Sequence, residues 1–166
     1  MIRWDEGNRR FHYRVVGVAI HNGSVLLHRA DHEPFWTLPG GRAEHGETAE
    51  ETIKREMLEE LATEVQLVRP LWFVENFFDY DGLSYHEISL YWLICFPPAS
   101  TPLTVNAFES RDGDVRLVFK WFPLSQDQLA GLPLLPAFLA TGLTDLPVSL
   151  VHVVQRDAVP SGKTPH

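Results

Sequence analysis

The sequence predicts a single α/β domain, and three observations support this. Segments rich in β-branched and aromatic residues alternate with segments whose apolar residues recur every four positions, the patterns of strands and helices. The length of 166 residues is that of one ordinary domain. Hydrophobic residues make up 45% and charged residues 22%, a globular balance rather than a disordered or membrane one. Strands mixed with helices in this order suggest a sheet sandwiched between helices.

The N-terminal half is predicted to hold a hairpin and one long helix. Two strands, Phe11 to Ile20 and Val25 to His28, flank a turn that contains Asn22-Gly23, a pair typical of tight hairpins. The helix begins after Thr48, where the spacing to Glu51 fits a capping box. Apolar residues at four-residue intervals give this helix a stripe that can pack on a sheet: Ile53, Met57 and Leu61.

The C-terminal half is predicted to add four strands and two short helical pieces. A strand pair, Leu71 to Phe78 and Tyr85 to Phe96, is joined through the turn-forming run Asp79 to Gly82. A loop with prolines and then acidic residues follows it. The remaining elements are a strand from Val115 to Trp121, a helix opened by the capping box Ser125 to Gln128, a helical piece from Leu132 to Leu139, and a strand from Leu150 to Val154.

Charge and hydropathy exclude several classes of protein. The net charge of −8 argues against binding a nucleic-acid polymer through a general basic field. Residues Met1 to Arg10 are polar, and no run of 18 apolar residues occurs, so we expect a cytoplasmic protein without a membrane segment. The single cysteine, Cys95, lies in an apolar run and is expected to be a buried small hydrophobe.

Three glutamates on the long helix carry the strongest chemical signal. Glu56, Glu59 and Glu60 stand at positions i, i+3 and i+4, so their carboxylates emerge on one face within one turn. Like charges this close repel unless water solvates them or a cation neutralises them. Hard oxygen ligands at this spacing suit Mg²⁺ or Mn²⁺. On its own, however, an E-x-x-E-E run is more often a solvated helix face.

The surrounding residues resolve that choice, because together they resemble the Nudix box, G-x5-E-x7-R-E-U-x-E-E-x-G-U with U an apolar residue. The positions that match in register are Gly41, Glu47, Arg55, Glu56, Met57, Glu59 and Glu60. Leu38 to Gly41 is also typical of the family. Two positions depart from the pattern, with Ala62 in place of glycine and Thr63 in place of an apolar residue. The helix is therefore expected to run on slightly or to end differently.

The resemblance implies a Nudix-type α/β/α sandwich with a mixed sheet over residues 1–155, followed by a loose tail over 156–166. It also implies a hydrolase that requires Mg²⁺ or Mn²⁺ and cuts a diphosphate linkage. By the same resemblance Glu56, Glu59 and Glu60 bind metal and are catalytic, and the carbonyl of Gly40 completes a coordination sphere. Three residues of the box are implied to be structural: Gly41, Glu47 and Arg55, with Glu47 and Arg55 holding loop against helix.

Four residues outside those roles are candidates for substrate binding. Arg42 follows the glycine pair and Arg29 ends the first hairpin, so either side chain could touch phosphate oxygens, although a surface role explains Arg29 equally well. Glu87 points to the same strand face as Ser89, toward the site or, as we favour, into a surface pair at its rim. Glu109 stands in the acidic loop, as a ligand, a base or, more simply, a solvated acid.

The function hypothesis is a hydrolase acting on a nucleoside diphosphate linked to another group, with Glu56 as the base that takes the proton from water. The alternative is a Nudix-fold sensing or protein-binding module without catalysis, which typically loses box carboxylates that are all present here. The position of Tyr80 weakly suggests a dinucleoside polyphosphate, but a hairpin turn explains this tyrosine better. The sequence leaves a homodimer open.

Overall fold

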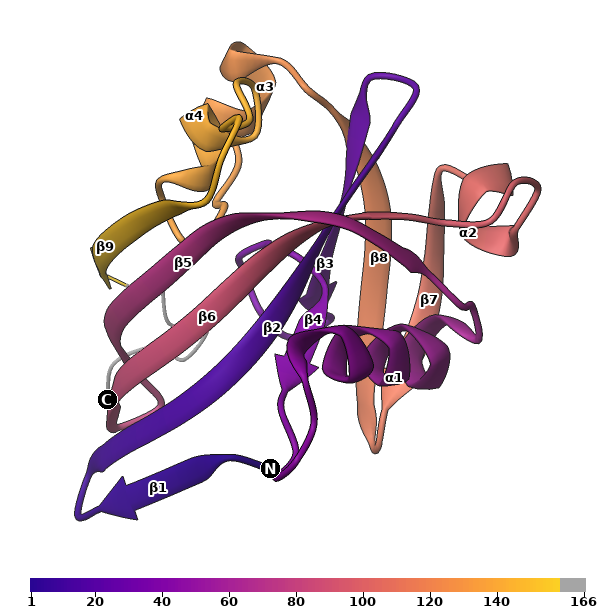
Figure 1. The fold of residues 1–166 in the computed structure, drawn as a ribbon. Coiled ribbons are helices and arrows are strands. Elements are labelled where there is room, and N and C mark those ends of the chain that lie inside the picture. The colour runs from indigo at the N-terminus through magenta and orange to yellow at the C-terminus, as the bar shows by residue number, and fades with distance from the viewer. Residues whose placement is uncertain (159–166) are drawn as a thin grey trace.

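The computed structural model describes residues 1–158, whose strands build one mixed sheet between helices (Figure 1). The strands are β1 (Arg3–Glu6), β2 (Arg9–His21), β3 (Ser24–Ala30), β4 (Gly40–Arg42), β5 (Gln66–Tyr80), β6 (Leu83–Cys95), β7 (Ala107–Asp112), β8 (Val115–Pro123) and β9 (Val151–Ala158). The helices are α1 (Ala49–Leu61), α2 (Thr101–Thr104), α3 (Gln126–Ala130) and α4 (Leu139–Gly142). The strand order is β7-β8-β3-β2-β6-β5-β9, and β1 and β4 also pair with β2. The β2–β6 and β5–β9 pairs are parallel and the others antiparallel, so the sheet is mixed, as predicted.

Two hydrophobic cores lie on opposite faces of the sheet. One core joins the sheet to α1 and includes Val15, Ala19, Ile53 and Met57. The other joins the sheet to α3 and α4 and includes Val16, Val18, Leu129 and Leu139. The alternation along β2 sends neighbouring side chains to opposite cores, and each fully buried aliphatic side chain contributes ~1.5–3 kcal/mol. This arrangement confirms the predicted sandwich.

Helix α1 begins and ends where the motif places its boundaries. Thr48 and Glu51 form both hydrogen bonds of the capping box, as predicted. At the other end Ala62 adopts the left-handed conformation, with φ 50° and ψ 34°, and its N–H donates to the Leu58 carbonyl at 3.0 Å. The expectation that the helix runs on is therefore wrong. Alanine takes the glycine conformation at a cost of ~1 kcal/mol.

The predicted first hairpin is present but short. Strands β2 and β3 pair only at Ile20 with Val25 and at His21 with Ser24, around a turn in which Asn22 and Gly23 both have positive φ. Beyond that point the strands separate, because β2 pairs with β6 and β4 whereas β3 pairs with β8. The long β2 is consequently a central strand with both faces covered.

Several predicted boundaries in the C-terminal half are wrong. Strand β5 begins at Gln66 and continues through Pro70, where shifts in register mark irregularities of the kind that tolerate proline. The acidic loop predicted before Val115 contains strand β7, which is anchored by Phe108 stacked on Phe119. The stretch from Leu132 to Leu139 is not helical. It carries one bridge to Trp36, and α4 starts only at Leu139.

The chain end and the cysteine also differ from expectation. Strand β9 runs through residues 156–158, which pair with residues 77–79 of β5, so the predicted boundary after residue 155 is wrong. The rest of the predicted tail, residues 159–166, lies outside the described residues. Cys95 is exposed rather than buried, because it ends β6. No helix within residues 1–158 is long and apolar enough to cross a membrane.

Candidate active site

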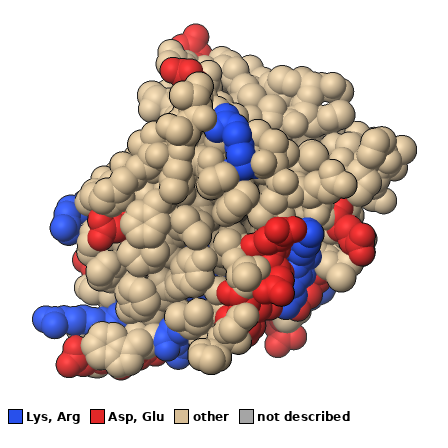
Figure 2. All heavy atoms as spheres, in the orientation of Figure 1, with Lys and Arg blue, Asp and Glu red and all other residues tan. Residues whose placement is uncertain are grey.

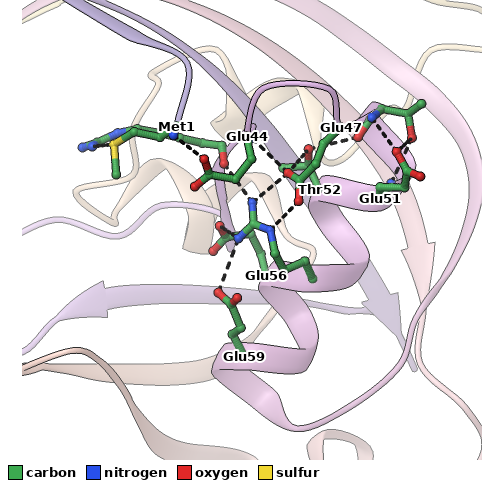
Figure 3. A network of polar contacts seen from close by, with 10 residues as sticks. Met1, Glu44, Glu47, Glu51, Thr52, Glu56 and Glu59 are labelled. Carbon is green, nitrogen blue, oxygen red and sulfur yellow. Dashed lines mark hydrogen bonds and ion pairs between the residues drawn. The ribbon is translucent and has the colours of Figure 1, made fainter.

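The scaffold of the site is an ion-pair network around Arg55 on α1 (Figure 3). Arg55 donates to both carboxylate oxygens of Glu47, at 2.7 and 2.9 Å, and to the carbonyl of Arg42 at 3.1 Å. Glu47 also accepts from the Glu44 backbone and from the Thr52 hydroxyl. The Arg55 hydrogen bonds lower the pKa of Glu47 to about 2. The loop before α1 is thereby fixed to the helix, as the sequence predicted.

The three box glutamates project from α1 into one cavity, with exposure that differs from one to the next, and acidic side chains gather on the surface near α1 (Figure 2). Glu59 is exposed, whereas Glu60 is only 8% exposed and its Oε2 atom has no hydrogen-bond partner. Burial, with the charge of Glu56 nearby, raises the pKa of Glu60 to about 8. Burial also raises the pKa of Glu56. The positive charge near these mutually repelling carboxylates compensates them only in part.

Arg55 supplies part of that charge. Its Nη1 donates to Glu56 at 2.7 Å and approaches Glu59 at 3.4 Å. Within residues 1–158, no three acidic, histidine or cysteine side chains already cluster closely enough to hold a metal ion. The donors nevertheless fit a divalent cation, because Glu60 presents an unpartnered buried oxygen beside two further carboxylates, all of them hard ligands.

Two glycines allow the backbone to pass close to this cluster. A Cβ atom on Gly41 would lie 2.0 Å from the carboxyl carbon of Glu56, and one on Gly40 would lie 2.2 Å from the Val15 carbonyl oxygen. A side chain at Gly40 would collide with the backbone of β2, whereas one at Gly41 would displace the Glu56 carboxylate. The Gly40 carbonyl, a predicted metal ligand, accepts from Arg14 Nη2 at 3.2 Å.

Arg14 and Arg42 form an uncompensated positive pair beside the glutamates. They lie directly opposite each other on β2 and β4, where like charges are unfavourable. Burial, together with the charge of Arg14, lowers the pKa of Arg42. Among the described residues neither guanidinium has a carboxylate within ion-pair distance, and their hydrogen bonds go to Gly40 and Met1. The pair is suited to bind an anion.

Two cavities meet at these arginines. One, of about 370 Å³, is lined by the α1 glutamates and the glycine strand β4. The other, of about 480 Å³, is lined by aromatic side chains that include Phe35, Phe78 and Tyr80. The residues common to both cavities are His12, Arg14, Arg42 and Asp112. The acidic cleft thus continues directly into an aromatic chamber of the size of small-molecule sites.

The structure gives the predicted substrate-binding residues different positions. Arg42 is at the junction of the cavities. Arg29 lines the aromatic cavity, but its guanidinium donates to the carbonyls of residues 30, 31 and 33 and lies over Trp36, so it holds the rim loop. Glu109 lines neither cavity and pairs with Arg116 at 3.2 Å. Asp112, at the tip of the same hairpin, lines both.

Glu87 is not the rim acid with a surface pair that the sequence favoured. It is 5% exposed and bonds His12 Nε2 at 2.5 Å and the Ser89 hydroxyl at 2.7 Å, in the floor of the aromatic cavity. Burial opposes its charge, but the His12 bond and the charge of Arg14 hold its pKa below its usual range. The sequence contained a signal for this pair, since His12 and Arg14 alternate with apolar residues in a strand.

A family model described as the NUDIX domain matches residues 11–136, which is most of the chain. The chain belongs to the NUDIX family of hydrolases. The match contains the three glutamates and both arginines of the junction, whereas β9 lies beyond its end.

The similarity to individual NUDIX proteins is limited, either to a short segment or to low sequence identity. A Bacillus subtilis (strain 168) protein, provisionally named an 8-oxo-dGTP diphosphatase, is 53% identical over 36 residues, which span 22% of this chain and 24% of that protein. A MutT NUDIX hydrolase from Burkholderia pseudomallei is 25% identical, with a TM-score of 0.54 over 76% of this chain and 92% of its own. A MutT protein from Bacillus halodurans is 17% identical, with a TM-score of 0.60 over 89% and 90%, and supports the fold alone.

Proposed function

We propose that this chain hydrolyses the diphosphate linkage of a nucleoside diphosphate joined to another group, nucleoside triphosphates included, with Mg²⁺ or Mn²⁺. The observation that carries the proposal is the meeting of the two cavities at Arg14 and Arg42. A diphosphate held between these arginines would extend one end toward the glutamates and the other into the aromatic chamber. A nucleotide has this combination of an anionic linkage and an aromatic base.

The residues divide the work of such a reaction. Glu56, Glu59 and Glu60, with the Gly40 carbonyl, would hold the metal. A divalent cation bound there lowers the pKa of its water and neutralises charge on the leaving oxygen. Glu56 is the proposed base, since burial raises the pKa of its carboxyl and so favours taking a proton. Arg14 and Arg42 hold the phosphates, and Arg55 keeps α1 against the loop.

The alternative of a sensing module without catalysis has less support. All box carboxylates are present, and Glu60 retains a buried oxygen that no protein group satisfies. Keeping an unpartnered carboxylate oxygen costs stability, and a module without a metal would have no use for it. The name of the Bacillus subtilis relative is consistent with a nucleotide substrate. The cytoplasmic location and the homodimer stay predictions.

The test is a release screen of nucleoside triphosphates, nucleotide sugars and dinucleoside polyphosphates, run with Mg²⁺, with Mn²⁺ and with a chelator. Products are separated by chromatography, so that the broken bond is identified. We expect a nucleoside monophosphate among the products and no turnover with the chelator. Failure to turn over any compound with either metal, in protein shown to be folded, would contradict the proposal.

A further inference from the structure

The end of the aromatic cavity away from the glutamates carries a polar pair that the proposed reaction does not use. Asn76 of β5 and Asp157 of β9 line this cavity but not the acidic one. Register places Asp157 beside Phe78, Phe78 beside Tyr85, and Tyr85 beside Arg10 of β2. Three strand spacings, about 14 Å, thus separate β9 from β2, and Arg14 lies a further ~13 Å along β2 from Arg10. A base attached to phosphates at Arg14 would reach toward this end.

Asp157 is held in one orientation. The backbone N–H of Ala137 donates to its Oδ2 at 3.1 Å, and the Gln155 side-chain amide donates to its Oδ1 at 2.8 Å. Gln155 is itself fixed, because its Oε1 accepts from the Phe138 backbone at 3.1 Å. A carboxylate has about four lone-pair directions, so each oxygen of Asp157 keeps one for a ligand.

Asn76 is buried but incompletely bonded. It is 6% exposed, and its Oδ1 has no hydrogen-bond partner. A buried amide without a partner costs ~1–3 kcal/mol, so the position calls for a bound group that supplies one. Because no side-chain bond from a described residue fixes the amide, either its oxygen or its nitrogen can turn toward a ligand.

The chemistry of this pair selects among nucleobases. A carboxylate only accepts hydrogen bonds, so it favours an edge with two adjacent N–H donors. Guanine presents such an edge in N1–H and the 2-amino group. Its neighbouring O6 is an acceptor, so it would take a hydrogen bond from Asn76 Nδ2 and not partner Oδ1. Adenine and cytosine place an unprotonated ring nitrogen beside their single amino group, and uracil flanks one N–H with two carbonyls, so each would put an acceptor against Asp157.

We propose that Asp157 and Asn76 read the base of the substrate and select a guanine edge. The proposal rests on the proposed function, which it sharpens by naming the class of base. Asp157 lies on β9, outside the family match that ends at residue 136. The residue proposed to select the base therefore lies on a different element from the α1 glutamates proposed to act on the phosphates.

The first test measures binding without turnover. Isothermal titration in a chelator compares GMP with IMP, which lacks the 2-amino group, with XMP, which has a carbonyl there, and with AMP. A bidentate pair discriminates by ~1–3 kcal/mol, so we expect GMP to bind roughly 5- to 150-fold more tightly than XMP and AMP, with IMP between them. Equal affinities for all four, or a preference for AMP, would overturn the proposal.

The second test uses a variant that should shift the preference from GMP toward XMP. Asp157→Asn keeps the size and an acceptor for the Ala137 N–H. Its NH2 group replaces the Oδ1 that accepts from Gln155, so that bond is lost, and it turns a donor toward the base, which suits the 2-carbonyl of XMP. We expect the GMP-to-XMP affinity ratio to fall at least tenfold. A purely structural role would weaken all four nucleotides alike. The matched control is His152→Gln, an exposed residue of β9 that pairs with Glu75, and it should leave the ratio unchanged.

The two proposals fail in distinguishable ways. Selective GMP binding by a protein that hydrolyses nothing supports the assignment of Asp157 and overturns the proposed reaction. Hydrolysis with no preference among the four bases does the reverse. If Asp157→Asn does not fold, the wild-type comparison of GMP with XMP still decides the base.

Discussion

The acidic cleft and the aromatic cavity share residues but are built in different ways. The glutamates of the cleft stand on one helix at fixed offsets, and a single ion pair, Arg55 with Glu47, sets their loop. The aromatic cavity takes side chains from β2, β3, β5, β6 and β9, brought together only by strand register. Helical spacing places the glutamates together within one short segment of the chain. The lining of the aromatic cavity comes together only when strands that are distant in the sequence pair.

This difference suggests that the two parts can change independently. The cleft contains groups for a reaction on phosphorus and leaves little freedom, because a side chain at Gly40 would collide with backbone and one at Gly41 would displace the Glu56 carboxylate. The aromatic cavity is bounded instead by side chains from separate strands. Chemistry and selectivity should therefore respond to different mutations, and each prediction below tests one side of that division.

The largest effect is expected in the acidic cleft. Glu59→Gln and Glu60→Gln should each lower kcat at least ~10²-fold, because an amide is a weaker ligand and does not offset a cation's charge. Folding should survive. Steady-state kinetics at saturating metal provide the measurement, and Glu50→Gln, on the same helix but paired with Lys54, is the control. Near-full turnover in both variants would rule these residues out as ligands.

Arg42 at the junction of the cavities and Arg29 at the rim of the aromatic cavity should differ in their effects on substrate binding and on stability. Arg42→Ala should raise KM roughly 10- to 150-fold with little change in Tm, since it removes ~1.5–3 kcal/mol of charge-assisted bonding to phosphate. Arg29→Ala should instead lower Tm, because three carbonyls lose their donor. Thermal melts and initial rates on both variants give the comparison. The reverse pattern would return Arg29 to the phosphate site.

Arg55→Ala should lower stability and activity together. Glu47 would lose its bidentate partner, and Glu56 would lose a positive charge beside other acids. We expect a drop in Tm of several degrees, on the order of 5 °C, together with reduced kcat. Differential scanning fluorimetry and kinetics measure the two, with Lys54→Ala as the control. Unchanged Tm with lost activity would reassign Arg55 from scaffold to chemistry.

The sequence predicted the cleft well because its information is local. The offsets from Gly41 to Glu60 specify one helix face, and Thr48 marks its start. The aromatic cavity was missed because its residues are separated in the chain. Nothing near Asp157 indicates that it lies beside Phe78, and Glu87 was placed at the rim because its partner, His12, is 75 residues away.

The wrongly predicted ends of helices and strands likewise depend on contacts between residues that are distant in the sequence. The strand was predicted to begin only after Pro70, at Leu71, but the local irregularities of β5 accommodate the proline, and only the pairing with β6 reveals them. Ala62 was expected to alter the helix end, yet the surrounding fold keeps the left-handed conformation that the motif's glycine would provide. In both cases tertiary context overrode a local preference.

The metal-free protein should lose stability as pH rises. Glu60 has a pKa of about 8 in the folded state and an ordinary pKa of 4.5 in the unfolded chain, so between these values the folded state binds more protons. That stability is present below pH 4.5 and is lost as pH rises through 8. Tm in a chelator should fall by roughly 5 °C from pH 6 to pH 9, and less in Glu60→Gln. A flat profile in both proteins would contradict a buried, uncompensated Glu60.

The smallest effect is expected at the rim of the aromatic cavity, where Tyr80 donates its hydroxyl to Glu33 and meets Phe35 edge-on at 6.1 Å. These contacts hold the Tyr80 ring against other side chains of the protein. Tyr80→Ala should therefore change kcat/KM for a dinucleoside polyphosphate and for the matching nucleoside triphosphate alike, within about threefold. Tyr80→Phe, which keeps the ring, separates the hydroxyl from the stacking surface. If the ring instead stacks on a second base, worth ~1–3 kcal/mol, the dinucleotide alone would lose roughly 5- to 150-fold. That outcome would extend the selective role of the aromatic cavity from one base to two.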